Sequence, residues 1–213
     1  MGLEAPGRSG LGVRIMSSVP INRPGHAIEW NLPSKRRVGM SALIAGESAI
    51  FTIFVVAYVF YLGKSITGPT PQEVLEVPIV GTICLLSSSF TIWRAERAIE
   101  GERMASFTLW LAGTIFLAIV FLADTALEWK KLIYQDGLTV STNLFGTTFY
   151  SLVGLHATHV VVGMFLLSAT LIFSLLGWVD SRQSERFGTI ALYWHFVDCV
   201  WIVVFTVVYL VGR

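Results

Sequence analysis

Ionisable side chains occur at helical spacing inside apolar stretches of this 213-residue chain. His156 and His159 are three positions apart, as are His195 and Asp198, so each pair would share one face of a helix. Two matching polar faces predict a hydrogen-bonded network between the two helices. Three imidazoles and a carboxylate could also bind zinc. A histidine that orients a carboxylate requires no metal, however, and we favour the structural network.

A further acid, Glu47, lies about ten residues into another apolar stretch, near mid-bilayer if that stretch crosses a membrane. An ionisable residue at that depth is costly and is a functional hypothesis by default. Small residues at four-residue spacing surround it and allow close helix contact, so we expect Glu47 to face another helix. Two roles stay open from the residues alone: a proton-exchanging or proton-relaying group, or a structural hydrogen bond between helices. The small residues are Ala42, Gly46, Ala45 and Ala49.

Simpler interpretations fit the other polar residues of these stretches. The serines at 87–89 lie mid-span, where a serine can bond its own helix or a neighbour, and we expect them to support packing. Asp124 and Glu128 are four positions apart, and Glu128 is followed by Trp129 and Lys130. We therefore expect Glu128 at the outer membrane interface, where a charge costs little.

Composition indicates that membrane-spanning helices position these groups. Hydrophobic residues make up 54% of the chain and charged residues 14%, whereas a soluble domain carries about 25% charged residues. A spanning helix needs about 17–25 mainly apolar residues. The predicted fold class is therefore all-α, an integral membrane bundle of five transmembrane helices. The spans are expected at 38–62, 77–93, 105–128, 144–177 and 187–211.

The remaining features narrow the class of protein. Residues 1–34 are rich in Gly, Pro, Ser and Arg and lack the apolar core of a signal peptide. We predict an irregular cytoplasmic tail there and a transmembrane domain over 35–213. The net charge of +1 provides no basic field for nucleic acid. Cys84 and Cys199 both lie in apolar stretches, which excludes a disulfide-rich scaffold. Common nucleotide-binding and hydrolase motifs do not occur in the sequence.

Basic residues predict the orientation of the spans, because cytoplasmic loops carry an excess of Lys and Arg. With a cytoplasmic N-terminus, eleven basic residues fall inside and four outside. The basic cluster at 35–37 directly precedes the first span and should dominate. We therefore expect the N-terminus in the cytoplasm and the C-terminus outside. The four outer residues are Lys64, Lys130, Lys131 and Arg213.

Five segments resemble, in order, the sequence of cytochrome c oxidase subunit III. Residues 193–201 (YWHFVDCVW) resemble the signature of that family's last helix, and residues 149–160 resemble its penultimate helix with two histidines. Residues 46–51 resemble the segment that carries an intramembrane glutamate. Counterparts also exist for residues 85–90 and for the pair at 128–129.

The resemblance covers residues 36–211 and implies a role without redox chemistry in this chain. The family's subunit holds no haem and no copper. It packs on the catalytic subunit I of an oxidase that also contains subunit II, supports proton uptake and preserves activity over many turnovers. Cytochrome c donates the electrons, and haem and copper lie in the partner subunits. The resemblance implies that Glu47 is the proton-related acid, and Trp194, Glu128 and Ser88 are further motif residues.

The family often has seven spans, and the two that this chain lacks would precede Lys35. Family members bind phospholipid in a cleft beside those two spans, so we expect contact with membrane phospholipids but not that form of binding. We expect a multi-pass protein of the bacterial cytoplasmic membrane. Alternatives are the equivalent subunit of a quinol oxidase, a subunit associated with a nitric-oxide reductase, and a metal- or proton-coupled transporter. Glu47 and the run Tyr193-Trp194-His195 favour the cytochrome c branch.

Overall fold

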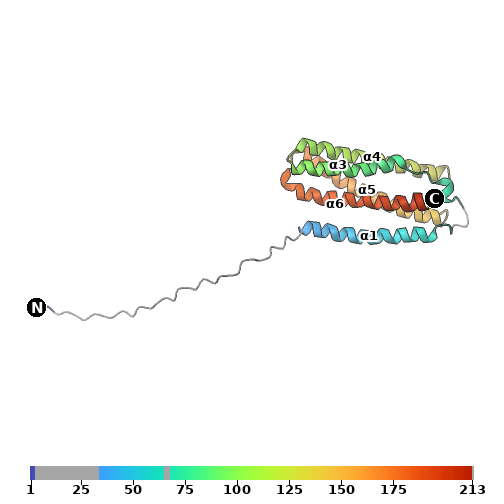
Figure 1. The fold of residues 1–213 in the computed structure, drawn as a ribbon, viewed down its shortest axis with the longest axis horizontal. Helices are drawn as coiled ribbons and strands as arrows, with labels where there is room; N and C mark the ends of the chain where they lie inside the picture. Colours follow the sequence, from blue (N-terminus) through green and yellow to red (C-terminus); the bar gives the residue numbers. More distant parts are fainter. Residues whose placement is uncertain (3–33, 65–67, 213) are drawn as a thin grey trace. The chain divides into compact units, whose positions relative to one another are not determined.

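The computed structural model describes residues 1–2, 34–64 and 68–212, so most of the predicted tail lies outside the described residues. Within them the chain forms helices and no strand, which confirms the all-α class (Figure 1). The last helix is preceded by a 3-10 turn and continues into a π-helical segment. The elements are α1 (Lys35–Tyr61), α2 (Pro71–Val74), α3 (Ile79–Glu100), α4 (Met104–Tyr134), α5 (Leu144–Leu175), η1 (Ser181–Gln183), α6 (Ser184–Phe205) and η2 (Thr206–Val211).

Four of the described helical segments are long and apolar enough to cross a membrane: α1, α4, α5 and the continuous run Ser181–Val211. Helix α3 covers the expected second span but is not among them, because four of its last seven residues are charged. The guanidinium of Arg94 lies over the Trp110 ring at 5.3 Å, and that of Arg97 lies over Trp93 at 5.3 Å. Such cation–aromatic pairs suit a membrane–water interface. The chain is therefore a multi-pass membrane protein.

Local signals explain where the helices begin. The Ser34 side chain accepts a hydrogen bond from the Arg37 N–H before α1, and Asn143 accepts one from Gly146 at 2.7 Å before α5. Helix α2 starts with a proline, and the Thr70 N–H donates to the Glu73 carboxylate at 3.0 Å. That bond holds the pKa of Glu73 below its usual range.

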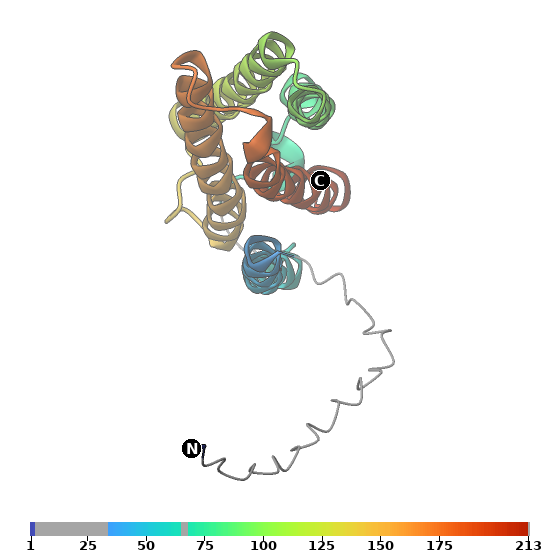
Figure 2. The same cartoon turned by 90° about the vertical axis from the view of Figure 1, so that its left-hand side faces the viewer.

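The helices pack around α6, which contacts α1, α3 and α5, while α4 packs against α3 and α5. Figure 2 looks along the bundle and shows α1 at one side of it, beside α5 and α6. Bulky rings from α6 and η2 fill the interior: Trp194 and Trp201 of α6 and Tyr209 of η2 are all fully buried. Trp194 can approach α5 because Gly163 has no side chain: a Cβ there would lie 2.8 Å from the indole.

Candidate functional site

Glu47 on α1 and His159 on α5 form a pair across the helix boundary. The Glu47 Oε2 lies 3.1 Å from Nε2 of His159, and Nδ1 of the same ring lies 2.8 Å from the Leu155 carbonyl oxygen. A carbonyl can only accept, so Nδ1 must carry a proton. The contact at Nε2 then requires one further proton, either on the ring or on the carboxyl. The hydrogen bond between the two side chains therefore uses one proton, carried by either Nε2 or Oε2.

Apolar side chains enclose this pair on one side and leave it accessible on the other. The ring of Phe51 is buried and its centroid lies 4.9 Å from that of His159. On the open side a groove of about 290 Å³ runs between α1 and α5, and the side chains of Glu47 and His159 are 25% and 13% exposed. The groove is otherwise lined by Met40, Leu43, Thr158, Val162, Leu166 and Tyr193.

The small residues next to Glu47 do not make the contact that the sequence suggested for them. All four are exposed, and a Cβ added to Gly46 would meet no atom within 4 Å. Helical geometry explains the difference, because residues one, two or five positions apart project about 100° to 160° away from each other. Glu47 points towards α5, whereas Gly46 lies on the outer face of α1.

A second polar cluster joins α3 to α6. The Ser89 hydroxyl donates to Oδ2 of Asp198, and its oxygen lies 3.3 Å from Nδ1 of His195. The single hydroxyl proton is used in the bond to Asp198, so Nδ1–H of His195 donates to Ser89. Asp198 is only 2% exposed, and its Oδ1 has no hydrogen-bond partner among the described residues.

His156 stands apart from both clusters. It is fully buried, stacks on Trp201 at a centroid distance of 5.0 Å and meets the edges of Phe51 and Phe121. Neither ring nitrogen has a hydrogen-bond partner within the described part of the chain. Residues three positions apart differ by about 60° around a helix, which directs His156 into the aromatic core and His159 towards α1.

We expected His156, His159, His195 and Asp198 to form one hydrogen-bonded network between α5 and α6. That prediction of their hydrogen-bond partners is wrong. His159 bonds to Glu47, while His195 and Asp198 face Ser89 on α3 rather than α5. Across residues 34–64 and 68–212, no three His, Cys, Asp or Glu side chains come together in an arrangement that could hold a metal ion. The geometry gives no support to the zinc interpretation.

The other motif residues link helices. The indole N–H of Trp194 donates to Ser88 at 2.9 Å, and Ser88 donates to the Leu85 carbonyl at 2.6 Å. Both Trp194 and Ser88 are fully buried, whereas Ser87 is exposed. Ser88 thus bonds Trp194 of α6, and Ser89 bonds His195 and Asp198 of the same helix.

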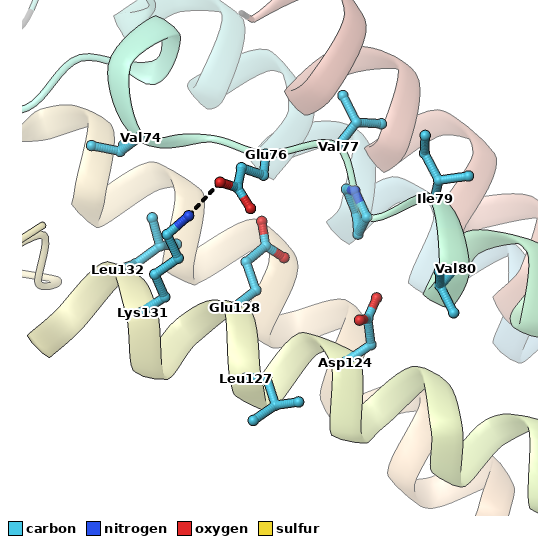
Figure 3. A pocket seen from close by; sticks show the side chains of 11 residues that line it. Val74, Glu76, Val77, Ile79, Val80, Asp124, Leu127, Glu128, Lys131 and Leu132 are labelled. Carbon is cyan, nitrogen blue, oxygen red and sulfur yellow. Dashed lines mark hydrogen bonds and ion pairs between the residues drawn. The ribbon is translucent and has the colours of Figure 1, made fainter. Parts of the chain in front are cut away.

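At one end of α4 three carboxylates line a pocket of about 330 Å³ (Figure 3). Glu76 pairs with Lys131, and Asp124 accepts the Gly81 N–H at 3.1 Å. Glu128, which we expected only to sit at the interface, accepts the hydroxyl of the buried Tyr209 at 3.0 Å. Each carboxylate therefore has a structural partner.

Sequence reasoning missed Ser89, Asp124 and Tyr209 as partners. Only Asp124 had a signal that could have indicated its role. Helix α3 follows Pro78, which offers no side-chain acceptor for the first amides of the helix. An acidic residue elsewhere in the chain was therefore needed to cap it. The partners of Ser89 and Tyr209 depend on how helices distant in sequence pack.

These observations define a class: a multi-pass helical membrane protein whose buried polar groups link its helices. Residues 36–213 match the family described as cytochrome c oxidase subunit III. The chain is 40% identical to cytochrome c oxidase subunit 3 of Synechocystis over 183 residues, 84% of this chain and 76% of that protein. It is 31% identical to the Alkalihalophilus pseudofirmus protein of that name over 192 residues, 89% of this chain and 93% of the relative. The chain belongs to the cytochrome c oxidase subunit III family.

Proposed function

We propose that this chain is the non-catalytic subunit III of a proton-pumping oxidase that takes electrons from cytochrome c. In this proposal it lies in the bacterial cytoplasmic membrane and packs on subunit I, in a complex that also contains subunit II. Haem and copper are held by those partners, and oxygen is reduced there. Family membership supports the assignment to an oxidase complex.

The Glu47–His159 pair carries the proposal for what the subunit contributes. Its shared proton lies between Oε2 and Nε2 at 3.1 Å, beside a groove in a membrane-embedded helix pair. A proton held between two bases in an apolar site can move from one base to the other while the hydrogen bond between them stays in place. We infer that the pair buffers protons for uptake into subunit I. The pumping step itself depends on redox energy released at the partners' metals.

The same proposal includes five spans, with α3 as the second, a cytoplasmic N-terminus and an outer C-terminus. The eleven-to-four distribution of basic residues supports this orientation. The two arginine–indole pairs at the end of α3 support placing that end at a membrane–water interface.

Affinity purification of the tagged full chain from its native membranes tests the function. We expect subunits I and II to co-purify, with haem absorbance and with cytochrome c oxidation by the purified fraction. Mass spectrometry identifies the partners, and the tag fused to an unrelated multi-pass protein is the control. A chain that purifies alone, or as a dimer without haem, would refute the proposal.

A further inference from the structure

We propose that Ser89, His195 and Asp198 form a second proton-exchange site, in which the buried Asp198 carboxyl exchanges its proton with the surface of the bundle through Ser89 and the imidazole of His195. This site uses neither Glu47 nor His159 and lies on the other side of α6, towards α3. It therefore goes beyond the proposed function and can be tested separately.

The first argument is the continuity of the hydrogen bonds. Nδ1–H of His195 donates to the Ser89 oxygen at 3.3 Å, and the Ser89 hydroxyl donates to Oδ2 of Asp198. A hydroxyl that accepts one bond and donates another can pass a proton along the chain by moving its own. Three side chains from two helices thus connect an imidazole to a carboxyl without a gap.

The second argument is that the two ends of this chain differ in exposure. Asp198 is 2% exposed, whereas His195 is partly exposed on a face of α6 where Leu192 is 39% and Ile202 49% exposed. With Nδ1 bound to Ser89, the opposite ring nitrogen Nε2 has no partner among the described residues and is not enclosed. The imidazole therefore connects the buried carboxyl to the outside of the bundle.

The proton balance of one transfer is simple. An acidic group that reaches this face of the bundle gives its proton to Nε2 of His195 and becomes its conjugate base, and Nδ1 passes its own proton to Ser89. The Ser89 hydroxyl gives its original proton to Oδ2 of Asp198. The result is a neutral carboxyl, an intact hydroxyl and an imidazole protonated at Nε2, so one proton has moved inward and no bond between heavy atoms has changed. The reverse sequence restores the starting state.

The third argument is that the helix contact alone does not need an acid. A neutral amide at position 198 could accept the Ser89 bond and avoid the cost of an ionisable group at membrane depth. In addition, Oδ1 of Asp198 is buried without a partner in the described chain, which a purely structural residue would tend to avoid. An acid that is only half satisfied is suited to accepting a proton.

Hydrogen–deuterium exchange of the carboxyl, followed by infrared spectroscopy, tests the relay. The full chain, with any subunits that co-purify, is placed in liposomes and moved from H₂O to D₂O at a pH where the Asp198 carboxyl band is present. The band is assigned by its loss in Asp198→Asn. We expect Ser89→Ala and His195→Phe to slow its deuteration by roughly a hundredfold, the lower end of what one positioned proton-transfer group contributes.

Matched variants separate a relay from a structural effect. Ser89→Thr keeps the hydroxyl and should exchange near the original rate, and Ser87→Ala removes an exposed serine of the same triplet and should change nothing. A loosened bundle would speed deuteration at Asp198 and Glu47 together, and that result would overturn the relay. Unchanged rates in both Ser89→Ala and His195→Phe, or no exchangeable Asp198 band at any pH, would overturn it as well. Failure to co-purify with an oxidase would affect only the proposed function, because the exchange can be measured on the chain alone.

Discussion

The carboxylate of Asp124 on α4 accepts a hydrogen bond from the backbone N–H of Gly81, in the first turn of α3, at 3.1 Å. The first amides of a helix have no partner within it, and a negative charge near them is favourable. Pro78 cannot supply such a group from the N-cap position. An acid on the neighbouring helix therefore caps α3, and this capping contact fixes how close α3 and α4 lie at that end.

Replacing Gly81 by alanine should break this contact. A Cβ at position 81 would lie 2.6 Å from Oδ2 of Asp124, so the carboxylate must move away from the amide it caps. We expect a loss of stability of about 0.5–2 kcal/mol, as for the loss of other helix N-caps, visible as a lower midpoint of thermal unfolding in detergent.

Gly46→Ala is the matched control, because a Cβ there would meet no atom within 4 Å. It should leave the midpoint nearly unchanged in the isolated chain. Equal midpoints for the two alanine variants would show that the Asp124–Gly81 contact does not limit the packing of α3 on α4.

The five long helices could be predicted from the sequence, because each contains most of an apolar stretch. Every expected span contains an observed helix, but α3 continues to Glu100 and α4 to Tyr134, beyond the apolar stretches at 77–93 and 105–128. Helices extend past the apolar region because backbone hydrogen bonds still form where charged residues reach water. Composition marks the membrane core and not the ends of a helix.

The pairing of the polar residues could be predicted only in part. Spacing along one helix indicates which residues share a face, and it singled out the pairs His156–His159 and His195–Asp198, whereas depth in the span singled out Glu47. It does not indicate which helix that face meets. The choice of partner depends on the rotation of each helix, which is set by large side chains such as Trp194 packing against Gly163.

The bond between Trp194 and Ser88 should contribute measurably to the stability of the bundle. Trp194→Phe leaves the buried Ser88 hydroxyl without its donor, and Ser88→Ala leaves the indole N–H unpaired. Each change should cost about 1–3 kcal/mol. In a double-mutant cycle the two losses should be less than additive by about 0.5–1.5 kcal/mol. Ser87→Ala, at an exposed position, is the control, and additive losses would exclude a direct interaction.

The orientation of the spans can be measured with alkaline phosphatase, which folds to its active form only outside the cytoplasm. A fusion after Arg213 should be active, because an odd number of spans from a cytoplasmic N-terminus ends outside. A fusion after Gly177, between α5 and α6, should be inactive. An inactive fusion at the C-terminus, with an active one at Gly177, would mean that α3 does not cross or that the orientation is reversed.

Glu47 is the acid for which the proposed function makes the sharpest prediction. A carbodiimide reacts with a protonated carboxyl in an apolar site, and Glu47 shares its proton with His159 beside an apolar groove. We therefore expect labelling at Glu47 in the intact complex and none at that position in Glu47→Gln. Preferential labelling of Asp198 would show that the wrong acid has been assigned to the accessible site.

Glu47→Gln should assemble normally, because an amide oxygen or N–H can still bond to Nε2 of His159. The variant should keep most of the initial rate of oxygen reduction, since the reaction takes place at metals in the partner subunits. The loss should instead appear in the rate of proton uptake and in the number of turnovers completed before activity decays, measured on purified complex in liposomes. His159→Gln should show the same pattern if the pair acts as a unit. Abolished oxygen reduction in a fully assembled Glu47→Gln complex would show that the residue belongs to the catalytic path and that the accessory role is wrong.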